Sequence, residues 1–211
     1  MNLRYTLATP SQPPQILQIY RERLQPGREA AYDAIEQESA RLAAALGCPH
    51  PYLGVESLTG PKEVWWLNGY ESAADQQQVY DAYAQNTALV TALQQNSARK
   101  AILTLEPIEV FVSYRQDASA GPPWILGEGR FLVIMVTKSH CAVGGTVFEA
   151  ADGTRYIVSP AQTRADADRR IAVAGSESTI FAVRPPWSFP AEEWIAADPL
   201  FWKPSSPAGR D

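Results

Sequence analysis

The sequence predicts an α+β protein whose first half, residues 15–117, runs strand, helix, strand, strand, helix, strand. Three observations predict this order. Apolar residues recur at helical spacing after Pro26 and Gly27, a hairpin pattern surrounds the turn at 59–62, and a second long helical stretch precedes a short apolar strand. Such a unit places a four-stranded antiparallel sheet under two helices.

The first strand and helix follow from residues 16–46. Residues 16–24 read as a strand that Pro26 and Gly27 stop, because proline lacks a backbone donor and glycine admits turn geometry. A helix is predicted over 28–46, and Gly47 ends it. We assign its apolar stripe to Ala31, Ala34, Ile35, Leu42, Ala45 and Leu46.

The remaining elements of the first half are a hairpin, a helical stretch and a strand. Residues 52–58 and 64–70 are predicted strands joined by the turn at 59–62. Ser72 is expected to cap the next helix, with Asp75 at the capping-box position. The helical stretch runs to residue 100 and is expected to break near Asn86. The last strand covers 109–115.

The second half, 129–203, is smaller and richer in strands. Residues 118–128 read as a linker, and 130–138 as a strand buried on both faces because it is apolar without alternation. A hairpin over 146–158 turns at Asp152 and Gly153, a helix starts at Thr163, and a strand (179–183) and a short helix (191–197) follow. Residues 1–14 and 204–211 are expected to be a flexible arm and a loose tail. The half has no long helix after its opening strand, so a degenerate repeat of the first half and an unrelated half both stay open.

Two segments resemble a known superfamily. YRERLQPG at 20–27, followed by a helix, and VWWLNGYES at 64–72 are similar to the dimeric α+β barrel superfamily, in particular its NIPSNAP-like and antibiotic-biosynthesis-monooxygenase-like branches. The resemblance covers the first half only. It implies a ferredoxin-like sheet that pairs into a barrel, with an apolar pocket between sheet and helices. Because one sheet face would otherwise be bare, we expect a homodimer or an intramolecular pseudo-dimer.

Composition and charge exclude several classes of function. The net charge is −5 and the basic residues are scattered, which argues against a nucleic-acid partner. No apolar run approaches the roughly 20 residues of a membrane span, and residues 1–14 contain no apolar signal core, so we expect a cytoplasmic protein. Gly127 and Gly129 precede a strand instead of linking a strand to a helix, so they form no dinucleotide loop. No cofactor is predicted.

Glu38 is the candidate catalytic residue. It falls between Ile35 and Leu42 on the predicted helix, where burial would raise the pKa of its carboxyl group as a general base requires. The alternative is that Glu38 reaches solvent or an arginine, with Arg21 and Arg23 as partners.

A set of aromatic and polar residues is the candidate ligand-binding surface. Trp66, Asn68 and Tyr70 alternate along one strand and therefore share a sheet face. An apolar wall with a few polar groups is typical of a ligand pocket, although core and interface packing use the same residue types. The full set is Tyr20, Trp66, Asn68, Tyr70, Tyr80 and Tyr83.

Cysteine and histidine occur as neighbours in two places, at Cys48 and His50 and at His140 and Cys141. Four such ligands could hold zinc if the halves brought them together, but the spacing is not that of a standard finger, so we predict no metal.

The preferred function is binding of a small apolar or aromatic molecule, with cofactor-independent oxygenation or isomerisation as its chemistry. A non-catalytic assembly or ligand-carrying protein is the main alternative, and a Cys/His metal protein is the third.

Overall fold

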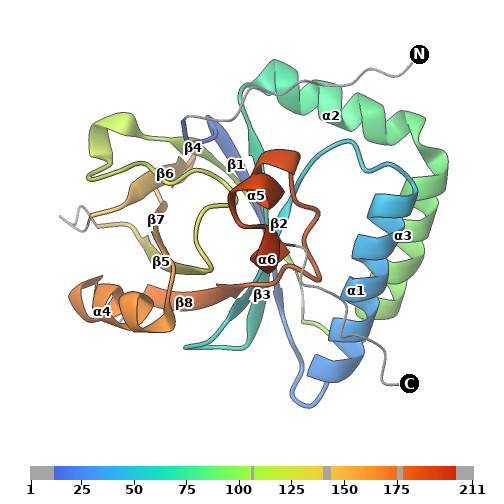
Figure 1. Ribbon diagram of the computed structural model, residues 1–211, viewed down its shortest axis with the longest axis horizontal. Helices are drawn as coiled ribbons and strands as arrows, with labels where there is room; N and C mark the ends of the chain where they lie inside the picture. The colour runs from blue at the N-terminus through green and yellow to red at the C-terminus, as the bar shows by residue number, and fades with distance from the viewer. Residues whose placement is uncertain (1–11, 106, 140–143, 175–177, 203–211) are drawn as a thin grey trace.

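Eight antiparallel strands close into one barrel in the order β1-β3-β2-β8-β5-β7-β6-β4 (Figure 1). This arrangement is seen in a computed structural model that describes residues 12–105, 107–139, 144–174 and 178–202. The strands are β1 (Ile16–Arg23), β2 (Leu53–Ser57), β3 (Glu63–Tyr70), β4 (Ile108–Tyr114), β5 (Phe131–Thr137), β6 (Thr146–Ala150), β7 (Arg155–Ala161) and β8 (Ser178–Val183).

The two halves of the chain each contribute a continuous run of strands. The first half supplies β4-β1-β3-β2 and the second supplies β8-β5-β7-β6, so each half places its fourth strand beside its first, then its third, then its second. Two seams join the runs. β2 pairs with β8, as in Val55 with Val183, and β4 pairs with β6, as in Val112 with Ala150. The inner face of the first sheet is therefore covered by the second half of the same chain.

Helices cover the two flanks of the barrel unequally. Helices α1 and α3 lie side by side along one flank, and α4 packs on β5, β7 and β8 on the other (Figure 1). α5 and α6 lie between the flanks in this view. The helices are α1 (Glu29–Ala45), α2 (Ala73–Gln85), α3 (Thr87–Lys100), α4 (Arg164–Ala174), α5 (Glu192–Ala197) and α6 (Pro199–Trp202), with a 3-10 turn, η1 (Gln116–Ala118), after β4.

The helix starts expected from the sequence are confirmed. The Ser72 hydroxyl accepts a hydrogen bond from Asp75 N at 3.1 Å, and the Asn86 side chain accepts one from Leu89 N at 3.2 Å, where the helical stretch breaks into α2 and α3. Thr163 caps α4 by accepting from Asp166 N at 3.1 Å. In each case a side-chain oxygen satisfies a backbone donor that the first helical turn leaves without a partner.

The predicted apolar stripe of the first helix is wrong at its alanines, whereas Ile35 is buried as predicted. Ala31, Ala34 and Ala45 are exposed. The buried residues of α1 are Tyr32, Ile35, Glu36, Ser39 and Ala43. Alanine has little apolar surface to bury, so the larger tyrosine and isoleucine set which side of the helix faces the sheet. The true stripe therefore includes a carboxylate.

Alternation along the strands fills the barrel and leaves a second layer outside. On β5, which is buried on both faces as predicted, Leu132 and Ile134 belong to the interior cluster, whereas Val133 packs outside with Ala167 of α4. On β1, Leu17 and Ile19 point inward, so Gln18, Tyr20 and Glu22 face outward toward α1 and α3. None of the helices in the described ranges combines the length and apolarity needed to cross a membrane.

Gly54 of β2 provides a test of the packing outside the barrel. A β-carbon at this position would lie 2.8 Å from the Trp66 ring and 3.2 Å from Trp187 Cβ. We expect Gly54→Ala to lower the free energy of unfolding by roughly 1–3 kcal/mol through overpacking, measured by urea denaturation. Gly144→Ala is the control, because its nearest atom, Ala120 O, is 3.9 Å away. Equal stabilities of the two variants would contradict the packing seen here.

Candidate functional site

A groove of about 260 Å³ lies between the outer face of the first sheet and helices α1 and α3. β1 contributes Gln18 and Tyr20 to its wall and β3 contributes Trp66 and Asn68. The strand register places Tyr20 opposite Trp66 and Gln18 opposite Asn68, so these side chains form one continuous surface. The remaining lining residues are Glu36, Ser39, Tyr52, Leu93, Ser97, Lys100 and Glu109.

Three buried charged groups meet at one end of this groove. The Lys100 ammonium, whose side chain is 12% exposed, lies 2.5 Å from Glu36 Oε1 and 3.4 Å from Glu22 Oε2. Glu22 and Glu36 are 4% and 2% exposed. The contact between Lys100 and Glu36 is an ion pair. Two carboxylates thus share one cation, and the cluster joins β1, α1 and α3.

Aromatic donors complete the surroundings of Glu22. Tyr32 donates its hydroxyl hydrogen to Glu22 Oε2 at 2.5 Å, and the Trp66 indole donates to the same oxygen at 3.3 Å. The Lys100 ammonium also lies 5.6 Å from the ring centroids of both Tyr32 and Trp66. Trp66 therefore has two contacts: its side chain lines the groove, and its indole nitrogen donates to the charge cluster.

The pKa values of Glu36, Lys100 and Tyr32 are all raised, for different reasons. Burial raises the pKa of the Glu36 carboxyl above its usual 4.5, and the nearby Lys100 opposes this shift without cancelling it. For Lys100, burial alone would lower the pKa, but Glu36 and Glu22 outweigh burial and raise it. Burial and the two carboxylates raise the pKa of Tyr32, so this hydroxyl stays a donor. Glu36 is thus a carboxylate with increased proton affinity beside a fixed cation.

Polar contacts between α1 and α3 fix the two helices relative to each other next to the charge cluster. Asn96, which is buried, donates to Ser39 Oγ at 3.0 Å, and Arg99 donates to Asn96 Oδ1 at 2.9 Å. Ser39 Oγ in turn donates to Ile35 O at 2.9 Å. These bonds lie within one turn of Glu36 on α1 and of Lys100 on α3.

The residues proposed for ligand binding fall into two groups. Tyr20, Trp66 and Asn68 line the groove together. Tyr70 lies beside it, stacked on His50 at 4.9 Å and donating its hydroxyl hydrogen to Gln18 at 2.9 Å.

The other two tyrosines of the set, Tyr80 and Tyr83, lie on α2 and do not line the groove. The Tyr80 ring packs edge-on against Tyr70 at 6.3 Å. The Tyr83 hydroxyl lies 3.1 Å from Cys48 Sγ. The predicted set is thus partly brought together, with half of it at the groove.

Glu38 is not buried, and the alternative that its side chain reaches solvent or an arginine is confirmed. Its side chain is 39% exposed and its carboxylate pairs with Arg99 at 2.9 Å. Arg21 and Arg23, the partners expected from the sequence, both bind Glu63 instead. Helical geometry explains the error, because a residue two positions from Glu36 lies on another side of the helix.

The structure describes only two of the four residues of the Cys/His hypothesis, Cys48 and His50. Cys48 and His50 lie together behind α2, where Cys48 Sγ contacts His50 O at 3.3 Å and burial lowers the pKa of His50. His140 and Cys141 lie outside the described residues. Within the described ranges, no group of three or more His, Cys, Asp or Glu side chains is arranged to hold a metal ion.

Among known proteins, similarity to this chain is found in solved structures. No protein-family model matches the chain, and no curated protein matches its sequence. Among solved structures, a provisionally named monooxygenase from Fusobacterium nucleatum aligns with a TM-score of 0.49 and 10% identity, over 82% of this chain and 93% of that one. A second provisionally named monooxygenase, from Lactobacillus acidophilus, aligns with a TM-score of 0.42 and 8% identity, over 88% of this chain and 87% of that one.

Lys100→Met tests the shared cation. Removing the ammonium leaves two buried carboxylates without it, so we expect a loss of roughly 3–5 kcal/mol in the free energy of unfolding at pH 8. The raised pKa of Glu36 means that the folded state takes up its proton readily at low pH, so the loss is expected to be smaller at pH 5.

Lys138→Met is the matched control for Lys100→Met. Its ammonium lies 3.0 Å from Asp152, but the side chains are 69% and 60% exposed, so the change is expected to stay within about 1 kcal/mol at both pH values. A Lys100→Met protein as stable at pH 8 as the control would contradict the shared-cation arrangement.

Proposed function

We propose that the groove between the first sheet and helices α1 and α3 is the active site of an enzyme. Its reaction begins with removal of a proton from a small aromatic or apolar substrate. The observation that carries this proposal is Glu36, a carboxylate that is 2% exposed, lines the groove and lies 2.5 Å from Lys100. Titratable groups with shifted pKa values in a concave site are favoured positions for acid-base chemistry.

Glu36 and Lys100 have complementary roles in this reaction. The raised pKa makes the Glu36 carboxylate a stronger proton acceptor than an ordinary glutamate at the surface. A substrate that loses a proton becomes an anion, and the Lys100 ammonium is a fixed positive charge beside the place where that anion forms. Glu22 and Tyr32 do not line the groove, so we assign them to positioning the ammonium.

The remaining lining residues favour a flat, largely apolar substrate with one polar group. Tyr20, Tyr52 and Trp66 provide aromatic surface and Leu93 an aliphatic one, while the Asn68 amide can both donate and accept. A volume of about 260 Å³ is slightly below the ~300 Å³ at which pockets for drug-sized ligands begin, so the substrate is small.

Isomerisation and oxygenation both begin with this proton transfer. Isomerisation needs only that the proton return to a different atom. In oxygenation, the substrate anion would react with molecular oxygen, and conversion of a CH₂ group to a carbonyl consumes one O₂ and releases one water. No reductant is required in either case, in agreement with the expectation of a cofactor-independent enzyme.

Proton abstraction can be measured without knowledge of the final product. A panel of small aromatic compounds with acidic C–H groups is incubated with the protein in D₂O under nitrogen, and deuterium incorporation is followed by NMR. We expect exchange of at least one compound, with a rate that rises with pH through the raised pKa of Glu36, because the base must be ionised. Oxygen uptake by the same compound in air separates an oxygenase from an isomerase.

Glu36→Gln should lower the exchange rate at least about 100-fold, the usual contribution of a general base. Glu38→Gln is the matched control on the same helix, since its ion pair is at the surface. The Glu36→Gln protein should fold, because glutamine keeps the shape and leaves Lys100 paired with Glu22. Exchange that survives Glu36→Gln, or that is lost equally in Glu38→Gln, would refute the assignment.

We also propose that the chain is an intramolecular pseudo-dimer in which the second half is a reduced repeat of the ferredoxin-like first half. The support is the strand order, which is the same in both halves. The connection between the first and second strands shrinks from residues 24–52 to residues 138–145, and the described part of the second half has no helix at the position of α1. The charge cluster, which needs a residue from α1, therefore has no counterpart there.

Light scattering tests this proposal. Since both seams of the barrel are closed within one chain, a second copy is not needed to cover the first sheet, and we expect the mass of a single chain in dilute solution. An obligate dimer that unfolds on dissociation would contradict the pseudo-dimer.

A further inference from the structure

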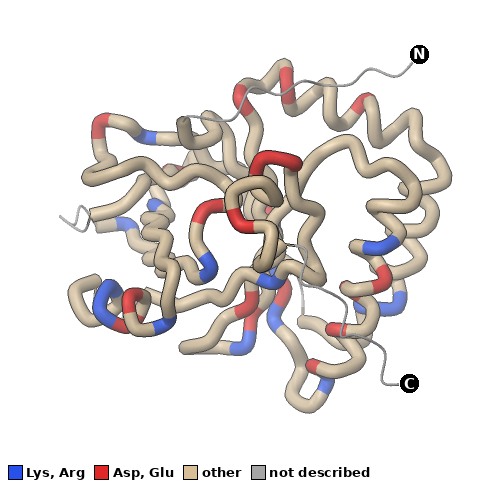
Figure 2. Tube along the Cα trace, viewed as in Figure 1, with Lys and Arg blue, Asp and Glu red and all other residues tan. Residues whose placement is uncertain are grey.

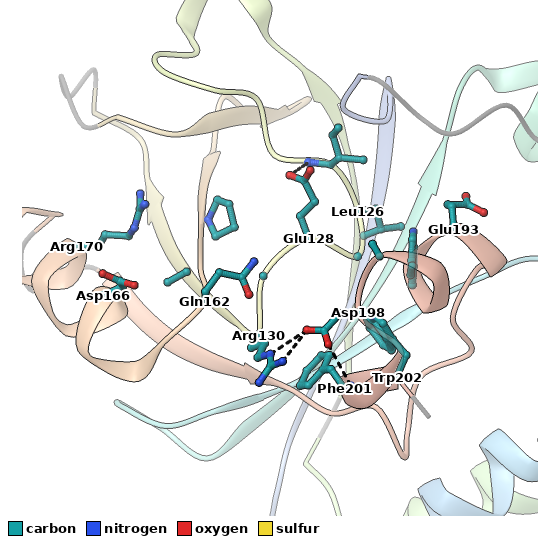
Figure 3. A pocket seen from close by; sticks show the side chains of 17 residues that line it. Leu126, Glu128, Arg130, Gln162, Asp166, Arg170, Glu193, Asp198, Phe201 and Trp202 are labelled. Atoms are coloured by element: carbon teal, nitrogen blue, oxygen red, sulfur yellow. Dashed lines mark hydrogen bonds and ion pairs between the residues drawn. The ribbon is translucent and has the colours of Figure 1, made fainter. Parts of the chain in front are cut away.

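A second, larger cavity of about 800 Å³ lies away from the groove, between α4 and the C-terminal helices α5 and α6 (Figure 3). This volume is within the roughly 300–1,000 Å³ range of small-molecule sites. Its lining comes from the 125–130 loop, the end of β7 and the turn after it, α4, and the 193–202 segment. It shares no residue with the groove.

The C-terminal side of this cavity is aromatic. The rings of Trp194 and Trp202 lie 5.4 Å apart, and both side chains are anchored in the interior cluster with 6% exposure. Phe201 packs edge-on against Trp202 at 5.1 Å and completes the wall. Gly127, at φ +92°, lets Trp194 approach the loop backbone, because a β-carbon there would lie 2.3 Å from the indole. The wall is thus fixed in place before any ligand arrives.

Arg130 lies beside this wall, and Gln162 and Arg170 lie farther along the cavity toward α4 (Figure 3). Both Nε and one terminal nitrogen of Arg130 bind the same oxygen of Asp198, at 3.1 and 2.7 Å, and the guanidinium lies 5.1 Å from the Phe201 ring centroid. Within the described residues, its other terminal nitrogen makes no hydrogen bond. Gln162 lies between Arg130 and Arg170 in Figure 3.

Among the described residues, three charged side chains of the cavity lining have no ion-pair partner, namely the carboxylates Glu128 and Glu193 and the cation Arg170. Asp198 is engaged by Arg130, Asp166 by Arg169 and Thr163, and Glu128 accepts from Ile125 N at 3.3 Å. Glu193 lies at the opposite side, on α5 (Figure 3). Arg170 of α4, which is exposed, has no ion-pair partner among the described residues. The unsatisfied charge on the α4 side is therefore positive.

We infer that this cavity binds a small carboxylate with an aromatic or apolar body. The carboxylate would bind Arg170 and the amide of Gln162, and the body would lie against Phe201 and the tryptophan pair. A guanidinium fork matches a carboxylate in geometry as well as in charge. This site stands independently of the activity proposed for the groove.

The test compares two probes that differ only in charge. 1-Naphthylacetate and the uncharged 1-naphthylacetamide are titrated into the full-length protein by isothermal calorimetry. We expect the carboxylate to bind about tenfold more tightly than the amide, as one charge-assisted hydrogen-bonded pair implies. Arg170→Gln should abolish that difference, and Ala197→Phe, which fills the cavity, should weaken both probes.

Two controls place the binding. Arg164 is on the same helix as Arg170, but its guanidinium binds Asp168 and does not line the cavity. Arg164→Gln should therefore leave the affinities for both probes unchanged. Glu36→Gln in the groove should also leave them unchanged. The inference is overturned if the carboxylate shows no saturable binding below about 10 mM. It is also overturned if the two probes bind equally, if Arg170→Gln leaves their difference intact, or if Glu36→Gln rather than Ala197→Phe abolishes binding.

Discussion

The ion pairs of Lys100 connect the structural elements on which the candidate active site depends. One ammonium at the C-terminal end of α3 contacts a carboxylate on α1 and another on β1. Burying charges is costly unless they are paired, so a change that leaves one of these charges without a partner is expected to weaken the packing of the helices on the sheet. Burial in the same arrangement raises the pKa of the Glu36 carboxyl, and the nearby Glu22 carboxylate adds to this shift. Stability and the proposed reactivity therefore have a common origin.

The barrel shows how two unequal halves can share one interior while only one of them has this site. Both halves contribute four strands in the same order, and their inward side chains form a single cluster. Outside the barrel the halves differ, because the first carries α1 and α3 and the second carries α4. Acidic and basic residues are interspersed along the whole trace (Figure 2), so charge alone does not distinguish the two flanks. The difference lies in which helices are present.

Much of the local structure could be predicted from the sequence because its signals are local. Ser72, Asn86 and Thr163 mark helix starts through bonds to residues three positions away, and alternation on β3 placed Trp66 and Asn68 on one face. The site was harder to predict from the sequence. Alanines were assigned to the buried side of α1, and this assignment placed Glu38 instead of Glu36 on that side. A stripe drawn through the large side chains Tyr32 and Ile35 would have included Glu36. Lys100 and Glu22 are 78 positions apart, and no local pattern indicates their contact.

The closure of the barrel has a consequence for the chain as it is synthesised. Val55 pairs with Val183, so the first seam cannot form until the last strand has left the ribosome. Until then the inner face of the first sheet, including Trp65 and Leu67, has nothing from the second half to cover it. Contacts between such distant residues slow folding and prolong the exposure of apolar surface. The nascent protein is therefore a natural client for chaperones that bind apolar segments, and chains that stop short of β8 would be prone to aggregate.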